Sequence, residues 1–150
     1  MARKPRHPPV RRRPSAPTCP YCGAPAEFLP NSESLYHGRD FGPVYACLPC
    51  KAWVGCHRGT AQPLGRLADA ALRRAKIEAH NAFDRTWRDL HARRQLADPG
   101  YALGRARASR YRRLAELLGI PPQSCHIGMF DVETCRRVVA LCASGALEAD

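Results

Sequence analysis

The spacing of hydrophobic positions changes near residue 60, from alternation in short runs to recurrence every three or four residues. Three short runs before that point have the alternation of β-strands: Ala26–Leu29, Pro43–Ala46 and Ala52–Gly55. The segments 31–34 and 38–40, between the first two runs, are rich in turn-forming residues. We therefore predict short antiparallel β-hairpins in the first part of the chain.

The second part of the chain has the hydrophobic period of helices. Apolar side chains at steps of three and four from Leu67 to Leu90 predict one long amphipathic helix. A second helix is predicted from Leu103 to Leu118, after the helix-breaking Asp98-Pro99-Gly100. Gly119 suits its C-terminal cap, and the prolines that follow shortly afterwards prevent continuation.

A third helix is predicted to begin after Asp131, because an aspartate carboxylate can cap the first turn of a helix. Apolar side chains recur through this segment at helical spacing and would share one face. They are Val132, Cys135, Val138, Val139 and Cys142.

Two cysteine doublets precede the helical part, Cys19-x-x-Cys22 and Cys47-x-x-Cys50, with twenty-four residues between them. Zinc favours tetrahedral coordination, and each doublet can place two sulfurs about 2.3 Å from one ion. The four cysteines are therefore predicted to bind one Zn²⁺ as the cofactor. Because a four-thiolate shell leaves no open position, this zinc is predicted to be structural.

The predicted fold is small and of the α+β class, with an N-terminal four-cysteine zinc ribbon followed by a three-helix C-terminal part. A ribbon of this size buries too little apolar surface to fold alone, so its folding is expected to require the metal. The predicted divisions are a disordered basic tail at 1–17, the ribbon at 18–60, an α-helical region packed on the ribbon at 61–144, and a flexible C-terminus at 145–150.

The formal net charge of +11 is concentrated at the N-terminus, because residues 1–18 hold six basic side chains and no acid. Five prolines and few apolar side chains in that tail predict a flexible cationic arm. Such an arm can neutralise nucleic-acid phosphates without reading sequence, and a solubilising extension is the alternative. The basic side chains are Arg3, Lys4, Arg6, Arg11, Arg12 and Arg13.

Other basic and aromatic residues add to this picture. Exposed ribbon residues could make closer nucleic-acid contacts, namely Tyr21, Arg39, Lys51 and Arg58. Five arginines between positions 105 and 113 crowd the second predicted helix. Helical rotation spreads them over several faces, so both ordinary solvated charge and a phosphate-binding surface stay open.

The remaining cysteines and histidines suggest a second site. Cys56-His57 and Cys125-His126 could meet at a second metal, with Cys135 as a further ligand. The alternative is structural packing, because a buried thiol behaves as a small hydrophobe. A catalytic metal would need histidine and acidic side chains to converge. The candidates for that are His57, His80, Asp84, His126 and Asp131.

Several runs are more specific than the doublets alone. They are Cys-Pro-Tyr-Cys-Gly at 19–23, Cys47-x-x-Cys50, Val54-Gly55-Cys56-His57-x-Gly59-Thr60 with Pro63-Leu64-Gly65, Ala79-His80-x-x-Phe83-Asp84-x-x-Trp87, Leu118-Gly119-Ile120, and Cys125-His126-Ile127-Gly128-Met129-Phe130-Asp131. In these runs, over residues 18–140, the chain resembles the small zinc-finger-containing proteins encoded by tailed bacteriophages and prophages. The resemblance implies the four zinc ligands and a phage or prophage origin, but no particular activity.

The leading functional prediction is a zinc-ribbon accessory protein that binds DNA or RNA. One alternative is a module that binds a host or phage protein, and another is a metal-dependent hydrolase or nuclease that uses the Cys-His groups; no catalytic residue is assigned. With no signal peptide and no run of eighteen apolar residues, we expect a soluble, cytoplasmic protein with reduced thiols, away from membranes. The resemblance to phage proteins implies that this cytoplasm is that of a bacterial host. The sequence assigns no oligomeric state.

Overall fold

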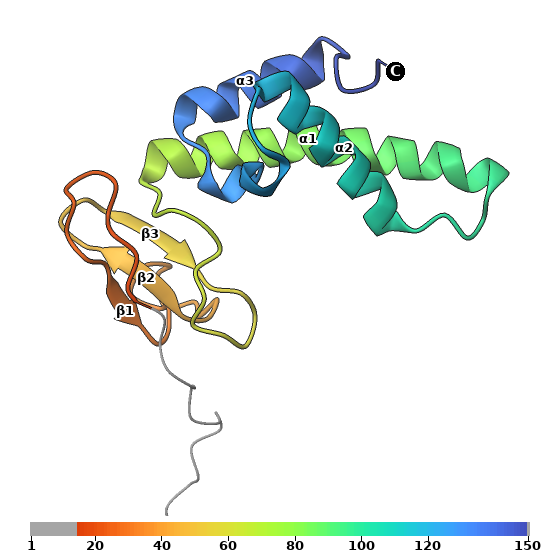
Figure 1. The fold of residues 1–150 in the computed structure, drawn as a ribbon. Helices are drawn as coiled ribbons and strands as arrows, with labels where there is room; N and C mark the ends of the chain where they lie inside the picture. The colour runs from red at the N-terminus through yellow and green to blue at the C-terminus, as the bar shows by residue number, and fades with distance from the viewer. Residues whose placement is uncertain (1–14, 150) are drawn as a thin grey trace, which may run out of the picture. The chain divides into compact units, whose positions relative to one another are not determined.

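The structure, a computed structural model, describes residues 15–149 of the chain. Residues 1–14, which hold most of the predicted basic tail, lie outside the described residues. The described residues divide after Asp69 into two compact units, the ribbon unit (residues 15–69) and the helical unit (residues 70–149) (Figure 1).

The first unit is built on a three-stranded antiparallel sheet (Figure 1). Its strands are β1 (Glu27–Leu29), β2 (Val44–Cys47) and β3 (Ala52–Gly55), and β2 lies between the other two. Tyr45 in the centre of β2 pairs with Phe28 of β1. The strand predictions are confirmed, each to within one residue at either end.

One face of this sheet forms the core of the first unit. Side chains at alternate strand positions share a face, so Tyr45 and Cys47 lie on the same side as Val54 of the neighbouring strand. These side chains pack with the fully buried Leu67 in one apolar cluster. The Tyr45 hydroxyl donates a 2.9 Å hydrogen bond to the Ala61 carbonyl oxygen, which ties the segment after β3 to the sheet.

The first unit continues past residue 60 to Asp69. Trp53 and Ala68 exchange two backbone hydrogen bonds, of 3.1 and 3.0 Å, and Leu67 lies in the core of the ribbon. The sequence had placed both Leu67 and Ala68 at the start of the long helix. Pairing with β3 and burial of Leu67 hold them outside that helix instead, so part of the predicted helical region belongs to the ribbon unit.

The second unit contains the three predicted helices: α1 (Ala70–Ala97), α2 (Leu103–Leu118) and α3 (Val132–Ala143). Two short 3₁₀ helices that the sequence analysis did not predict, η1 (Pro122–Ser124) and η2 (Ile127–Met129), connect α2 to α3. The positions at which these helices begin and end determine which of their side chains can pack against one another.

The predicted helix ends are present. Gly119 follows α2 in the left-handed conformation, at φ 69°, and its N–H donates back to the Glu116 carbonyl oxygen. The Asp131 carboxylate accepts a 2.8 Å hydrogen bond from the Thr134 N–H and caps α3. These two ends define the turn region that joins α2 and α3.

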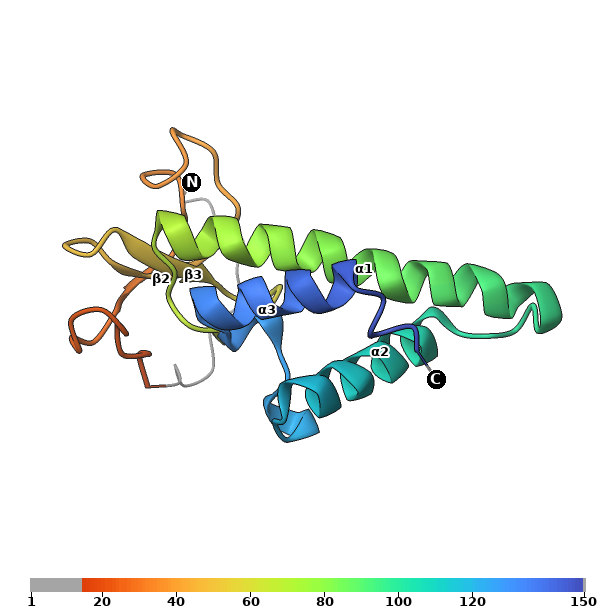
Figure 2. The same cartoon turned by 90° about the horizontal axis from the view of Figure 1, so that it is seen from above.

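Helix α1 is the element on which the other two helices pack (Figure 2). Its buried side includes Leu72, Phe83 and Leu90, and the Phe83 ring contacts the Tyr111 ring of α2 at a centroid distance of 4.4 Å. Figures 1 and 2 show α3 beside the first part of α1, whereas the end of α1 and the following loop extend beyond α3. None of the helices within residues 15–149 has the length and hydrophobicity that a membrane span requires.

The chain end after α3 differs from the flexible C-terminus predicted at 145–150. Leu147 is fully buried, and its carbonyl oxygen accepts a 2.6 Å hydrogen bond from the Arg110 guanidinium of α2. Arg113 donates to the neighbouring Ala146 carbonyl oxygen at 3.4 Å. Residues 146 and 147 are therefore held against α2.

Candidate functional site

The two cysteine doublets come together in the first unit. The Sγ atoms of Cys19, Cys22, Cys47 and Cys50 all lie within 4.8 Å of one another, although the doublets are far apart in sequence. The Cys22 and Cys47 Sγ atoms lie 3.6 Å apart. Within residues 15–149 this is the one group of three or more potential ligands that could hold a metal ion.

The spacing of these sulfurs fits zinc. A tetrahedron with Zn–S bonds of about 2.3 Å has sulfur–sulfur edges of about 3.8 Å. The Cys22–Cys47 separation of 3.6 Å and the upper limit of 4.8 Å for all sulfur pairs are compatible with such a tetrahedron. The four thiols would hold Zn²⁺ as a closed structural site, in which the ion links the turn before β1 to the turn between β2 and β3.

The backbone prepares both doublets in the same way. Gly23 follows Cys22 with φ 77°, and Lys51 follows Cys50 with φ 50°, so each doublet is followed by a left-handed residue. The Gly23 N–H donates a 2.9 Å hydrogen bond to the Cys19 carbonyl oxygen and closes the first turn. Glycine adopts this conformation without steric cost, whereas Lys51 is a non-glycine residue in the same region.

The shifted pKa values of thiols in this cluster also favour a bound cation. Burial opposes ionisation of Cys19, but backbone hydrogen bonds from Tyr21 and Cys22 and the neighbouring thiols outweigh it and lower the Cys19 pKa to about 7. Side-chain hydrogen bonds with Cys22 and Cys47 raise the pKa of the Cys50 thiol to about 12. One thiolate forms readily, and four adjacent thiolates require a positive ion.

Comparison with known protein families agrees with this geometry. The sequence model of a family described as a zinc-finger-containing domain matches residues 15–144. The chain belongs to this family. Neither a search of curated proteins nor a search of solved structures returned a match. Membership of this family supports zinc binding by the four cysteines. The family description assigns no role to the other surfaces of this zinc-finger-containing protein.

The residues predicted for a second metal site are divided between the two units. Cys56 and His57 follow β3 in the ribbon unit, whereas Cys125, His126 and Cys135 belong to the helical unit. Burial raises the pKa of Cys56 and Cys135, and that of Cys125 to about 11, which favours protonated thiols. A site that joins the two pairs stays a prediction.

The His80 and Asp84 pair on α1 does not form the hydrogen bond that their spacing allows. The Asp84 carboxylate instead accepts a 2.9 Å hydrogen bond from the Trp87 indole N–H and lies 3.9 Å from the Arg88 guanidinium. This use of Asp84 is structural, because it holds the indole of the buried Trp87 in place.

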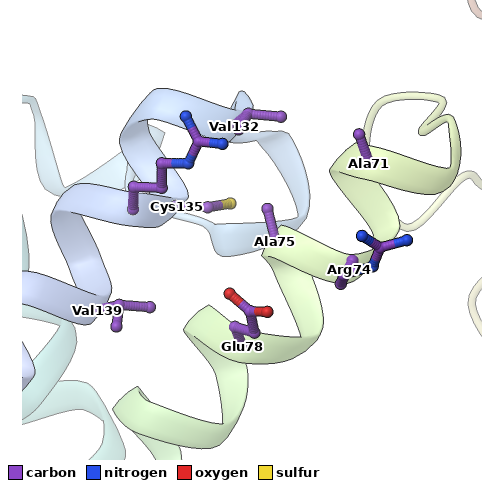
Figure 3. Close-up of a pocket in the computed structure, with 8 residues that line it drawn as sticks. Ala71, Arg74, Ala75, Glu78, Val132, Cys135 and Val139 are labelled. Atoms are coloured by element: carbon purple, nitrogen blue, oxygen red, sulfur yellow. The ribbon is translucent and has the colours of Figure 1, made fainter.

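A shallow groove of about 340 Å³ lies between α1 and α3 (Figure 3). Its lining combines small apolar side chains with charged ones: Ala71, Arg74, Ala75, Glu78, Val132, Cys135, Arg136 and Val139. Cys135 is fully buried, and burial raises the pKa of its thiol. With no histidine among these lining residues, the groove holds no thiol paired with an imidazole base.

The predicted ribbon contacts with nucleic acid are accessible, but they lie in a segment, residues 15–69, whose side chains carry no net charge. Tyr21, Arg39, Lys51 and Arg58 are all exposed, and the Tyr21 hydroxyl also accepts a 3.1 Å hydrogen bond from the Asp69 N–H. Residues 15–69 contain four basic and four acidic side chains. Four thiolates with one Zn²⁺ would add a net charge of about −2.

The strongest positive region among the described residues spans the end of α1, the following loop and most of α2, and only its α2 half was noticed in the sequence. Residues 85–113, called the basic hairpin below, contain nine arginines and two aspartates. Arg110 is buried and Arg113 is half-buried. The seven exposed arginines are Arg85, Arg88, Arg93, Arg94, Arg105, Arg107 and Arg112. A charge count across the loop, instead of one helix at a time, would have found this region.

Aromatic side chains order several of these arginines. The guanidinium carbons of Arg88, Arg105 and Arg107 lie 5.0–5.2 Å from the ring centroids of Trp87, Tyr101 and Tyr111, respectively. The turn between the helices is also fixed, because the His91 ring nitrogen lies 3.1 Å from the Tyr101 carbonyl oxygen. The basic hairpin therefore presents positive charge from a defined helical frame.

Proposed function

We propose that this zinc-finger-containing protein binds nucleic acid, with zinc as the structural metal of its ribbon and the basic hairpin as a main phosphate-binding surface. The observation that carries the proposal is the concentration of seven exposed arginines on residues 85–113. Only two acidic residues, Asp89 and Asp98, lie in the same segment. Phosphate is the anion that such a surface meets at high density on DNA or RNA.

The distribution of charge supports a division of roles. The formal charges of the ribbon side chains, residues 15–69, sum to zero. Residues 1–18 and the basic hairpin, by contrast, carry net charges of +6 and +7. These two segments would supply the salt-dependent attraction, because each neutralised phosphate releases counterions. The ribbon would add direct side-chain contacts with the nucleic acid, and these do not depend only on the net charge of the ribbon. The exposed residues that could make them are Tyr21, Arg39, Lys51 and Arg58.

Two features of α2 suit phosphate binding in particular. Arginine guanidinium groups bind phosphate through two parallel hydrogen bonds, and stacking on Tyr101 and Tyr111 restricts Arg105 and Arg107 before a ligand arrives. The first turn of α2 also has no acidic residue and no side-chain cap. The positive end of the helix dipole therefore adds to the arginine charge in the same region.

The origin and setting of the protein are also proposals. The resemblance to phage and prophage proteins supports a role in the cytoplasm of an infected bacterium, on phage or host nucleic acid. The module that binds a host or phage protein stays the alternative prediction. Zinc held by four thiolates has no open coordination position, so a hydrolase would need a second metal at the Cys-His groups, and that alternative also stays a prediction.

Binding should be measured by fluorescence anisotropy of labelled DNA and RNA as the salt concentration is raised from about 50 to 200 mM. The variant to compare is Arg93→Gln/Arg94→Gln/Arg105→Gln. We expect weaker binding and a slope of log affinity against log salt that is shallower by about 2 to 3, at roughly 0.7–0.9 per lost phosphate contact.

The matched control is Arg74→Gln/Arg136→Gln/Arg137→Gln, which removes the same charge from exposed residues of α1 and α3 in the same unit. Its salt slope should stay close to that of the unmodified protein. Equal losses in both variants would remove the basic hairpin as the binding surface. If the unmodified protein binds neither DNA nor RNA, the proposed function is wrong and the protein-interaction alternative gains support.

A further inference from the structure

An exposed aromatic side chain stands on the ribbon, in the loop between β1 and β2. Phe41 is 69% exposed, and its ring contacts the Tyr36 ring edge-on at a centroid distance of 5.0 Å. Tyr36 in turn meets Trp53 of β3 at 6.1 Å and accepts a 3.0 Å hydrogen bond from the Trp53 indole N–H. These three residues form an aromatic step on the ribbon, with Phe41 as its outer member.

Hydrogen bonds within the loop fix the backbone that carries Phe41. The Phe41 N–H donates a 2.8 Å hydrogen bond to the hydroxyl of Ser32, which is fully buried. The Asp40 carboxylate accepts hydrogen bonds from the Ser32 N–H at 3.1 Å and from the Gly42 N–H at 2.8 Å. The loop is thus closed across its base, and the exposed ring is presented by an ordered backbone.

This ordering is not explained by core packing, because most of the Phe41 ring contributes nothing to apolar burial. The aromatic step lies on the face of the sheet opposite the zinc-side core, since Trp53 alternates with the core residues Ala52 and Val54 along β3. The ribbon therefore holds one rigid apolar ring in solvent, away from the metal cluster.

The surroundings of the ring indicate the kind of partner it fits. The preceding loop is polar and exposed at Glu33, His37 and Arg39, so the apolar surface amounts to little more than one ring. A protein partner would need a broader apolar centre to its interface. One ring has the size of one nucleobase face, and aromatic side chains stack on unpaired bases of any sequence.

Charge next to the ring agrees with a nucleic-acid strand. Arg39 is exposed two residues before Phe41, within reach of a phosphate beside a stacked base. The intervening Asp40 uses its carboxylate within the loop, where it accepts hydrogen bonds from Ser32 and Gly42. The carboxylate of the residue directly before Phe41 is thus engaged by donors of the loop itself.

We propose that Phe41 stacks on an unpaired base and that the ligand of the protein is single-stranded nucleic acid. Arg39 contacts the adjoining phosphate, and the Tyr36–Trp53 pair supports the ring. This inference rests on the proposed nucleic-acid function and adds to it the class of strand. Duplex DNA does not use the ring, because its bases are already stacked on one another.

The test compares Phe41→Ala with Leu64→Ala, which removes a similarly exposed apolar side chain, 53% exposed, from the same unit. The probes are a fluorescein-labelled oligothymidine of about fifteen nucleotides and a duplex of the same length. We expect Phe41→Ala to weaken oligothymidine binding by about 5- to 150-fold without changing its salt slope. Duplex binding and the Leu64→Ala variant should be unaffected.

A second variant reports stacking through its own fluorescence, so the test does not rest only on the loss of affinity in Phe41→Ala. Phe41→Trp should retain binding, and oligothymidine should quench its added tryptophan fluorescence relative to the unmodified protein. Unchanged zinc content and circular dichroism of Phe41→Ala confirm that the fold is intact.

The outcomes separate the two proposals. If the unmodified protein binds oligothymidine and Phe41→Ala binds it equally well, the stacking role is overturned and the nucleic-acid function stands. Equal losses for duplex and single strand would overturn the single-strand assignment. Absence of binding by the unmodified protein to every nucleic acid would reject the underlying function, and the inference with it.

Discussion

The guanidinium of Arg110 on α2 is buried and donates a 2.6 Å hydrogen bond to the carbonyl oxygen of Leu147, beyond the end of α3. This contact closes the second unit, because it joins two segments that lie thirty-seven residues apart. Arg110 Nε, by contrast, is buried without a hydrogen-bond partner among the described residues. Arg110 is therefore a structural arginine inside the basic hairpin, whose other arginines are exposed or, at Arg113, half-buried.

Arg110→Ala is expected to destabilise the helical unit by about 2 kcal/mol or more, because it leaves the Leu147 carbonyl unpaired and removes a packed aliphatic stem. Arg112→Ala is the matched control, since Arg112 is exposed on the same helix. Urea unfolding followed by far-ultraviolet circular dichroism measures both. Equal unfolding midpoints for the two variants would contradict a structural role for Arg110.

The left-handed turn after the first cysteine doublet leads to a second prediction. Gly23 has φ 77°, and a Cβ atom at this position would meet no atom within 4 Å. Gly23→Ala should therefore cost about 1–2 kcal/mol of stability through backbone strain alone.

Gly55→Ala serves as the control for that substitution. Gly55 lies outside the left-handed region, and its added Cβ would be 3.6 Å from a Leu64 methyl carbon, an ordinary contact. We expect nearly unchanged stability of the zinc-loaded protein. The difference between the two variants, measured by urea unfolding, isolates the conformational demand of the metal-binding turn.

Local sequence signals were sufficient for most secondary structure. The alternation around Tyr45 indicated β2, the apolar stripe through Phe83 indicated α1, and the caps at Gly119 and Asp131 marked real helix ends. The zinc site was also predictable, because cysteine pairs at metal spacing require few assumptions about the rest of the chain.

The errors occurred where tertiary contacts decide between local alternatives. Leu67 fits the helical period as well as the ribbon core, and pairing between Ala68 and Trp53 decides in favour of the ribbon. The role of Arg110 depends on a carbonyl thirty-seven residues away, and no local pattern reports it. Phe41 likewise gave no signal, because its exposure depends on the loop closed by Ser32 and Asp40.

Removal of zinc should affect the two units differently, and each contains one tryptophan that can report on it. Trp53 lies in the ribbon and Trp87 in α1. A strong chelator should remove one zinc per chain and change the fluorescence of a Trp87→Phe protein, in which only Trp53 remains, because the metal replaces a large apolar core in the ribbon. The helical circular dichroism should largely persist.

The complementary Trp53→Phe protein, in which only Trp87 reports, is the control for that experiment. Its fluorescence should change little when zinc is removed, because Trp87 packs within the helical unit and its indole binds Asp84. Simultaneous loss of both signals at one chelator concentration would show that the units unfold together. Elemental analysis of the dialysed protein would confirm the loss of zinc.

His80 on α1 gives the helical unit a predictable acid sensitivity. Burial lowers the pKa of the His80 imidazole below its ordinary value of 6.5, against the opposing attraction of Asp84. In the unfolded chain the imidazole takes up a proton near pH 6.5, whereas the folded chain resists protonation until the pH is lower. The unfolded state therefore binds more protons in this interval, and the free energy of unfolding must fall as the pH drops through it.

The test measures urea unfolding at several pH values in the Trp53→Phe protein, where the fluorescence of Trp87 reports on the helical unit. His80→Gln should flatten the fall in the free energy of unfolding between about pH 7 and pH 5. The control His126→Gln, a change at an exposed residue, should leave that fall unchanged. An unchanged slope in His80→Gln would mean that another group controls the acid response.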